Sequence, residues 1–327
     1  MIRACVIGVG RMGSQHVRCL TELDEACLLA VADPDAPHAN AIAQRYGCRA
    51  YADYREMLTA ERPDAVIAAV PTSLHTAVAS RVIEHGCHLL VEKPLADTPA
   101  AAHQLVKAAQ DRGVRLAVGH IERFNPAVRQ LREIITAGTL GHILSCSAKR
   151  VGLPSPHLDE TNVVIDLAVH DLDVISFLLG GRPQVVSAVT GRLIGGPHED
   201  YADILLITEN VPCVIQVNWV TPVKIRTLSV VGTMGYAELN YITQTVYLYR
   251  RQPVEPLVSY QELVARYGEA EKETVHSGGE EPLKAELRAF ITAIRNGVTP
   301  EASGEDGLQA VELAHEILNC ARQVEAR

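Results

Sequence analysis

Four titratable side chains interrupt an otherwise apolar stretch, VVIDLAVHDLDVISFLLG, at residues 163–180. If this stretch is a helix, Asp166, His170 and Asp173 follow one another at i, i+4 and i+7 and share one narrow face. A carboxylate one turn from an imidazole can orient the ring for acid–base chemistry near neutral pH. A solvated helix edge or a structural ion pair gives the same pattern, so the spacing alone leaves the alternatives open. Asp171 and Asp173 are expected to be structural, because helix-borne carboxylates mostly serve solvation or ion pairing.

A second candidate site lies near the start of the sequence, where VIGVGRMG places Gly8, Gly10 and Gly13 in a GxGxxG pattern after an apolar run. Such glycines allow a tight turn and let the backbone approach a pyrophosphate at a helix N-terminus. Asp33 ends the next apolar run, where a carboxylate can accept hydrogen bonds from the adenosine ribose hydroxyls. Because Asp33 repels a 2′-phosphate and ADPDAPH contains no arginine, NAD is predicted as the cofactor rather than NADP. The contacts predicted from the glycine loop are Gly8, Gly10, Arg11, Met12 and Gly13.

Two further apolar runs end in polar residues at the carboxyl edge of the expected sheet, where ligands bind in open α/β folds. VEKP, residues 91–94, presents Lys93 directly before a proline that can fix the direction of the side chain, more rigidly still if the bond is cis. AAVPTSLH, residues 68–75, ends the preceding strand similarly, although His75 is equally compatible with an ordinary helix face. The cofactor contacts predicted here are Pro71, Thr72, His75, Glu92, Lys93 and Pro94.

The strands and helices that must position the predicted cofactor contacts lie in residues 1–120. This segment alternates short apolar runs with amphipathic stretches; the runs are IRACVIG, CLLAVAD, CRAY, DAVIAAVP, CHLLVEKP and VRLAVGH. Near-continuous apolar strands separated by helices indicate a parallel sheet covered on both faces. The sequence therefore predicts a doubly wound α/β Rossmann domain at 1–120 that binds NAD.

The remaining residues, 121–327, have a different pattern. A helix at about 125–136, a strand at 142–151 and the helix at 163–180 precede several strand-like runs that begin at residue 184. These predict an α+β domain with a large, open, mostly antiparallel sheet. Residues 251–281 are predicted to be a long surface excursion, and helices at 282–296 and 304–325 to end the domain. Since an apolar face of an open sheet needs a cover, we expect a homodimer or homotetramer packed through that face.

Composition argues against several classes of function. The chain of 327 residues is 47% hydrophobic and 21% charged, as in a soluble globular protein of about two domains. Its eight cysteines form no CxxC pair, which disfavours a metal site and is typical of a reducing cytoplasm. A net charge of -9 disfavours nucleic-acid binding. No apolar run reaches the roughly 18 residues of a membrane span. With a first strand beginning at Ile2, we expect no signal peptide, no membrane partner and a cytoplasmic location.

Taken together, these motifs resemble the Gfo/Idh/MocA oxidoreductases. The resemblance rests on GxGxxG, on Asp33, on EKP at 92–94 and on DLAVHDLD at 166–173, in that order along nearly the whole chain. It implies that Lys93, Asp166 and His170 converge on the nicotinamide as the catalytic residues. The implied reaction is oxidation of a secondary alcohol by hydride transfer to NAD, with the hydroxyl proton going to Lys93 or His170.

Within the family, VGHIERFNPAV, NVVIDLAVHDLD and VNWVTPVKIRTLSVVGTMGYAELNY resemble the members that oxidise the C3 hydroxyl of UDP-N-acetylglucosamine. A UDP-sugar needs cations for its diphosphate, and Lys224 and Arg226 share one face of PVKIRT. The substrate contacts expected on this basis are Lys93, Arg123, Asn125, Lys149, Arg150, Asp166, His170, Trp219, Lys224 and Arg226. Each basic residue could instead lie on a solvated sheet face, and Trp219 could simply pack. Two alternatives are a dehydrogenase of a free polyol or sugar, such as inositol, and an NAD-binding sensor without turnover.

Overall fold

The computed structural model describes residues 1–154, 161–251, 272–276 and 278–325, which form two compact units. The first unit contains Met1–Phe124 and Glu280–His315, and the second contains Asn125–Gly279 and Glu316–Arg327. Residues 280–315 therefore pack with the first unit, although the sequence pattern groups them with the second domain. The chain reaches the second unit only a few residues beyond position 120, where the strand and helix alternation of the first domain ends.

The sheet of the first unit is built from β1 (Ile2–Ile7), β2 (Ala26–Ala32), β3 (Arg49–Tyr51), β4 (Ala65–Ala68), β5 (His88–Val91) and β6 (Leu116–Val118). These strands are all parallel and lie in the order β3-β2-β1-β4-β5-β6. Every residue of β4 is buried, as expected for a central strand covered on both faces. The strand order reverses between β1 and β4, and in open α/β sheets dinucleotides bind at the carboxyl ends of the strands at such a reversal. The predicted doubly wound sheet is confirmed.

Helices cover both faces of this sheet. On one face, α1 (Arg11–Thr21), α2 (Ala36–Tyr46) and α9 (Pro282–Asn296) contribute to one apolar cluster with the strands. On the other face, α3 (Tyr54–Glu61), α4 (Thr72–Glu84) and α5 (Pro99–Arg112) contribute to a second cluster. Each helix thus buries one apolar stripe against the parallel strands, which is why the strands read as almost uninterrupted apolar runs.

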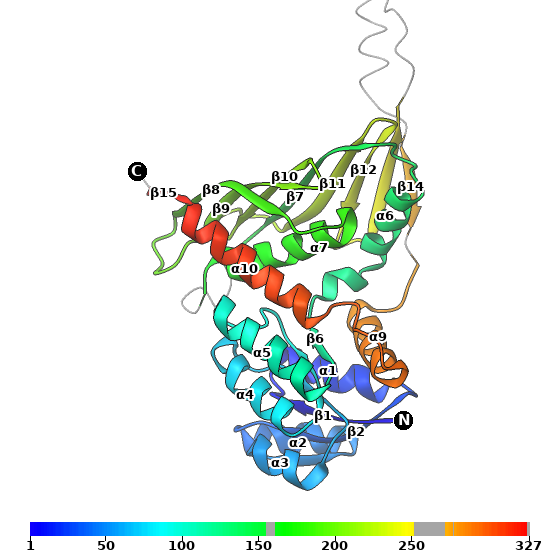
Figure 1. Cartoon of the computed structure of the whole chain (residues 1–327), viewed down its shortest axis with the longest axis vertical. Helices are drawn as coiled ribbons and strands as arrows, with labels where there is room; N and C mark the ends of the chain where they lie inside the picture. Colours follow the sequence, from blue (N-terminus) through cyan, green and yellow to red (C-terminus); the bar gives the residue numbers. More distant parts are fainter. Residues whose placement is uncertain (155–160, 252–271, 277, 326–327) are drawn as a thin grey trace, which may run out of the picture. The chain divides into compact units, whose positions relative to one another are not determined.

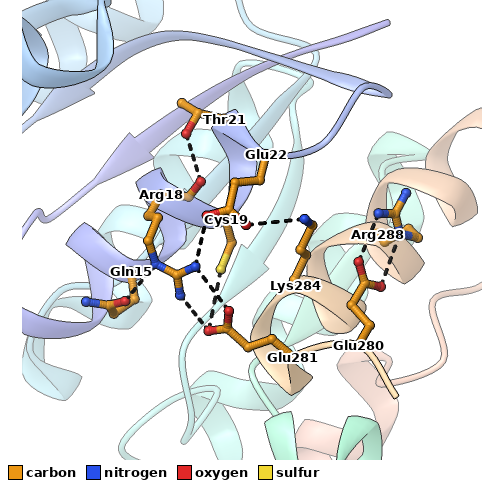
Figure 2. Close-up of polar contacts among 9 residues, drawn as sticks. All are labelled: Gln15, Arg18, Cys19, Thr21, Glu22, Glu280, Glu281, Lys284 and Arg288. Carbon is orange, nitrogen blue, oxygen red and sulfur yellow. Dashed lines mark hydrogen bonds and ion pairs between the residues drawn. The ribbon is translucent and has the colours of Figure 1, made fainter. Parts of the chain in front are cut away.

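Helix α9 packs against α1. Ion pairs also link the two segments (Figure 2). Arg18 Nη2 lies 2.5 Å from Glu281 Oε1, and Lys284 Nζ lies 3.2 Å from Glu22 Oε2. These ion pairs are partly exposed, so they orient the helices more than they stabilise them. The stabilisation comes from the apolar face of α9, which contributes Leu283, Leu287, Phe290 and Ile291 to the apolar cluster.

Among the described residues, the second unit contains a sheet of nine strands in the order β14-β13-β12-β11-β7-β10-β9-β8-β15. Their bounds are β7 (Ile143–Val151), β8 (Gln184–Arg192), β9 (Tyr201–Thr208), β10 (Val211–Asn218), β11 (Ile225–Gly232), β12 (Gly235–Asn240), β13 (Thr245–Arg250), β14 (Glu273–His276) and β15 (Arg322–Glu325). All neighbours are antiparallel except the pairs β10–β7 and β15–β8. Helices α6 (Pro126–Thr136) and α7 (Val169–Leu179) lie against one face of the sheet (Figure 1). The predicted open, mostly antiparallel sheet is confirmed.

Three details differ from the sequence-based expectation. The expected helix at 163–180 begins with a π-helical segment, η2 (Val164–Ala168), which continues into α7. The last helix, α10 (Gly304–Cys320), ends before residue 325, because Arg322–Glu325 forms β15 at the sheet edge beside β8. Part of the expected excursion at 251–281 forms β14, while 252–271 lies outside the described residues. Both strands depend on a distant partner strand, which a local pattern does not reveal.

Candidate active site

The three glycines of the GxGxxG loop have different steric surroundings. Gly8 has a φ of +82°, and a Cβ there would lie 2.5 Å from the carbonyl oxygen of Ala69 at the end of β4. A Cβ at Gly13 would overlap the carbonyl oxygen of Gly8, so helix α1 can begin this close to β1 only without a side chain. At Gly10, by contrast, a Cβ would meet no atom within 4 Å. Gly8 and Gly13 therefore allow the loop to pack, and Gly10 leaves its outer side open to the backbone approach that a pyrophosphate needs.

The N-terminus of α1 is suited to an anion. Gly10 is the N-cap, no side chain caps the helix, and its first turn contains no acidic residue. The first N–H groups and the helix dipole therefore favour a negatively charged ligand. Arg11 is exposed and Met12 is half-buried in this first turn. These residues fit the diphosphate of NAD.

Asp33 helps to hold the glycine loop in place. Its Oδ2 accepts a hydrogen bond of 2.9 Å from the Val9 N–H, and its Oδ1 accepts one of 2.9 Å from the Asp35 N–H. The Val9 carbonyl accepts a hydrogen bond of 2.6 Å from Ser14 Oγ and lies 2.8 Å from His38 Nε2. Polar contacts to both the N–H and the carbonyl of Val9 therefore fix the main chain between Gly8 and Gly10. The GxGxxG pattern by itself does not indicate these roles of Ser14 and His38.

The ends of β4 and β5 carry the other predicted cofactor contacts. Pro71 is exposed and precedes α4, which begins at the half-buried Thr72. His75 is only 1% exposed; its Nδ1 lies 2.6 Å from the Pro94 carbonyl and its Nε2 lies 2.9 Å from the Val70 carbonyl. Both ring nitrogens lie within hydrogen-bond distance of main-chain oxygens of the same unit, which gives His75 a structural role; its contact with the cofactor stays a prediction.

The EKP segment follows β5 and includes a cis Lys93–Pro94 peptide bond. Lys93 is half-buried and Pro94 is buried. Glu92 Oε1 lies 2.8 Å from Nε2 of His16, a fully buried residue of α1. Burial raises the pKa of Glu92, but the hydrogen bond and charge of His16 and the charge of Lys93 outweigh it, so the pKa is lowered. Glu92 is therefore a carboxylate at neutral pH, and it pairs with His16 inside the first unit.

In the second unit, the polar residues of 163–180 fall into two pairs. Asp166 and His170 are half-buried, whereas Asp171 and Asp173 are 0% and 3% exposed. Asp166 lies in the π-helical η2, and His170 lies in the first turn of α7. The single α-helical stripe predicted at i, i+4 and i+7 is therefore interrupted at Asp166, which lies in the π-helical segment, whereas His170 and Asp173 keep the i, i+3 relation within α7.

Asp171 links α7 to the sheet. Arg150 of β7 donates from Nε to Asp171 Oδ2 at 2.8 Å and from Nη2 to Oδ1 at 3.1 Å. The Tyr241 hydroxyl donates to the same Oδ1 at 3.2 Å, and the guanidinium lies 4.7 Å from the centre of the Tyr241 ring. Asn125 caps α6 and donates to the Tyr241 carbonyl. Asp171 is structural as predicted, and Arg150 and Asn125 belong to the same internal network.

The remaining predicted substrate contacts have different surroundings. Arg123, in the first unit, is 5% exposed, and its guanidinium donates to Asp306 and to the Glu301 carbonyl. Trp219 is 2% exposed. Arg226 donates to the carbonyl oxygens of Val151 and Ile225. Lys149 and Lys224 are exposed, and Lys149 faces the opposite side of β7 from Arg150. Within the second unit, Lys149 and Arg150 therefore lie on opposite faces of the sheet.

Within the described residues, no group of three or more His, Cys, Asp or Glu side chains is arranged to hold a metal ion. In the same residues, no helix is long and apolar enough to cross a membrane.

Comparison with known proteins agrees with this geometry. Residues 2–120 match the family model for an oxidoreductase family with an NAD-binding Rossmann fold, and residues 128–238 match that for the GFO/IDH/MocA C-terminal domain. The UDP-N-acetylglucosamine 3-dehydrogenase of Acidithiobacillus ferrooxidans is 30% identical over 250 residues, 76% of this chain and 77% of that protein. A solved structure of that enzyme has a TM-score of 0.84 at 28% identity and covers 98% of this chain and 97% of its own.

A second relative differs in substrate. Inositol 2-dehydrogenase 2 of Saccharopolyspora erythraea is 29% identical over 325 residues, which cover 96% of this chain and 91% of that protein. Both relatives are named as dehydrogenases, one of UDP-N-acetylglucosamine and one of inositol, and the two family models together match residues 2–120 and 128–238 of this chain. The chain therefore belongs to the Gfo/Idh/MocA oxidoreductase family and is an NAD-dependent oxidoreductase that acts on CH–OH groups.

Proposed function

We propose that this enzyme oxidises the C3 hydroxyl of a UDP-N-acetylglucosamine-type nucleotide sugar to the 3-keto sugar. The observation that carries this proposal is the similarity to the UDP-N-acetylglucosamine 3-dehydrogenase, which extends over 98% of the chain in structure. The glycine loop, the uncapped N-terminus of α1 and Asp33 support NAD as the oxidant.

Lys93, Asp166 and His170 are the side chains proposed to act on the reacting hydroxyl. Bound NAD supplies the hydride acceptor. The hydroxyl proton must pass to a base that is active near neutral pH, and His170 and Lys93 are the two candidates. Asp166 can orient the imidazole or accept a hydrogen bond from the sugar, and the Lys93 ammonium can stabilise negative charge on the alcohol oxygen. The alcohol loses one hydride and one proton, which gives a ketone.

The diphosphate of the substrate is assigned to Lys224 and Arg226. The main chain of Lys224 and the guanidinium of Arg226 lie beside the same residue, Gly152. A Cβ at Gly152 would lie 3.6 Å from Lys224 Cα and 3.8 Å from Arg226 Nη1. Lys224 is exposed and Arg226 is half-buried. We leave Arg123 and Arg150 out of this role, since their guanidinium groups form ion pairs with Asp306 and Asp171 inside the units.

The substrate is tested by following NADH absorbance with UDP-N-acetylglucosamine, free N-acetylglucosamine and myo-inositol side by side. Turnover of the nucleotide sugar alone, with competitive inhibition by UDP, is expected. Lys224→Ala should raise the KM for the nucleotide sugar by about 10-fold or more, because a charge-assisted contact contributes roughly 1.5–3 kcal/mol. Lys272→Ala is the matched control, since Lys272 is an exposed lysine of the same unit to which no substrate contact is assigned.

The catalytic assignment is tested with His170→Asn and Lys93→Ala. Each variant should lower kcat by at least about 100-fold and leave NAD affinity nearly unchanged, the usual scale for a positioned acid–base group. Lys107→Ala, an exposed lysine on α5, is the control for loss of a positive charge. Near-normal turnover in both catalytic variants would overturn the assignment.

A free polyol is the second candidate substrate. It is favoured by the inositol 2-dehydrogenase relative, which matches 96% of this chain at 29% identity. The internal ion pairs of Arg123 and Arg150 also reduce the number of cations available for a diphosphate. Oxidation of myo-inositol without inhibition by UDP would establish this alternative.

We also propose that the enzyme is a homodimer or homotetramer through the open face of the nine-stranded sheet. Strand pairing puts Ile207, Val214 and Val231 on the same face, and they are 39%, 44% and 37% exposed. Exposed apolar side chains on three central strands favour a cover from a second copy. Val214→Glu should dissociate the oligomer, as measured by sedimentation; a wild-type monomer would refute the proposal.

A further inference from the structure

Two buried histidines contact the residues on either side of Lys93. We call Glu92, Lys93 and Pro94 the Lys93 turn. His16, from α1, contacts the Glu92 side chain, and His75, from α4, contacts the Pro94 carbonyl. Both histidines lie outside the turn in sequence. As whole residues, His16 is 0% exposed and His75 is 1% exposed.

On the Glu92 side, the carboxylate is enclosed on several sides. His16 Nε2 lies 2.8 Å from Oε1, and the Lys93 N–H donates to Oε2 at 3.3 Å. Gly119, at the end of β6, packs directly against it, because a Cβ there would lie 2.9 Å from Glu92 Oε2 and 3.2 Å from Glu92 Cα. The carboxylate therefore has little room to rotate, and its hydrogen bond to the main chain reaches Lys93 itself.

On the Pro94 side, His75 connects two loops of the same unit. Its Nδ1 lies 2.6 Å from the Pro94 carbonyl, and its Nε2 lies 2.9 Å from the Val70 carbonyl. Val70 and Pro71 lie in the connection from β4 to α4. The Lys93 turn is thus tied to the start of α4 by His75 and to α1, which begins at the glycine loop, by His16.

We propose that His16 and His75 are positioning residues, which hold the Lys93 turn fixed relative to the glycine loop and the start of α4. This inference rests on the proposed function, in which Lys93 acts on the substrate. Buried polar groups that bridge three segments fix a single arrangement, and a displacement of about 1 Å at a reacting group can reduce the rate by about 100-fold. Neither histidine needs to touch the cofactor or the substrate.

The first test measures Lys93 directly and does not depend on turnover. The enzyme without substrate is labelled with a lysine acylating reagent, and the extent of labelling at Lys93 and at Lys107 is read by peptide mass spectrometry. Lys107 is exposed on α5 and serves as the internal reference. His16→Leu and Gly119→Ala should each raise the ratio of Lys93 to Lys107 labelling, because a loosened turn exposes its half-buried lysine. An unchanged ratio in both variants would overturn the proposal.

The second test is a double-mutant cycle on kcat. His16→Leu and His75→Leu should each lower kcat by about 10- to 100-fold with little change in the KM for NAD, and His16→Gln, which retains a donor, should recover part of the loss. In the Lys93→Ala background the same substitutions should have almost no further effect. Equal losses in both backgrounds would show general destabilisation and refute the positioning role. If Lys93→Ala itself retains turnover, the proposed function fails, whereas the labelling result still decides whether the histidines hold the turn.

Discussion

Phe290 provides a direct test of whether α9 is part of the NAD-binding unit. Its ring is 2% exposed and belongs to the apolar cluster formed by α1, α2, α9 and the parallel strands. Phe290→Ala should therefore lower the free energy of unfolding of this unit by about 3–5 kcal/mol, the usual cost of removing a buried aromatic ring. Arg288, on the same helix, has a side chain that is 38% exposed and forms an ion pair with Glu280 (Figure 2) and another with Glu25. Arg288→Ala should cost no more than about 1 kcal/mol.

The two units can be followed separately during unfolding in urea. Trp219 is the only tryptophan and lies in the second unit, so its fluorescence reports that unit. Binding of NADH reports the first unit. With a slope of about 2 kcal/mol per molar urea, a loss of 3–5 kcal/mol moves the midpoint of the NADH-binding transition down by about 1.5–2.5 M. Phe290→Ala should shift this transition more than the Trp219 transition.

The control decides between a core role and a surface role for α9. Arg288→Ala should move the NADH-binding midpoint by less than about 0.5 M on the same scale. An NADH-binding transition that is unchanged in Phe290→Ala would refute the assignment of α9 to the first unit. So would a fragment of residues 1–124 that binds NADH with the stability of the whole chain.

Three further outcomes follow from single side chains. Asp33→Ala should reduce the preference for NAD over NADP by at least about 10-fold in kcat/KM, because a charge repulsion of about 1–4 kcal/mol at about 4 Å is removed. Under native conditions the exposed thiols of Cys27 and Cys320 should react first with a thiol reagent, since burial raises the pKa of the thiols in the Rossmann core; rapid reaction of all eight would contradict this. Burial raises the pKa of Asp306, but the charge and hydrogen bond of Arg123 outweigh it and lower the pKa. The resulting stabilisation of the folded state is fully present above about pH 3.9, the pKa of an aspartate in the unfolded chain. It is lost as the pH falls through the lower pKa of Asp306 in the folded state. The unfolding midpoint of Asp306→Asn should therefore decline less steeply in acid than that of the wild type.

Local sequence signals were sufficient for most of the fold. The first sheet could be predicted because a strand covered on both faces must be apolar at nearly every position, as in β4. The glycine loop could be predicted because two of its positions, Gly8 and Gly13, have steric requirements that only glycine meets. Asp33 could be placed beside this loop because the end of β2 adjoins the end of β1 in a parallel sheet.

The partners of charged residues could not be predicted in the same way. Arg123 and Asp306 are 183 positions apart in sequence, and His16 and Glu92 are 76 apart. A periodic pattern indicates which face a side chain takes, but a distant group decides whether a cation is neutralised inside the protein. For this reason Arg123 seemed available for a diphosphate, and His16 carried no signal that linked it to the EKP segment.

The π-helical segment η2 (Val164–Ala168) affects how related chains should be compared. A π turn closes its hydrogen bonds one residue later than an α turn, so it is equivalent to a single-residue insertion in an α-helix. Deleting one residue from η2 would restore the α-helical period, and because the wider π turn already accommodates the extra residue, the segments on either side would keep nearly the same directions. If the deletion lay between Asp166 and His170, their spacing would fall from four residues to three and both side chains would stay on one side of the helix. A related chain without the extra residue can therefore carry an equivalent carboxylate three residues before the imidazole, and an ungapped alignment across η2 would pair side chains that point in different directions.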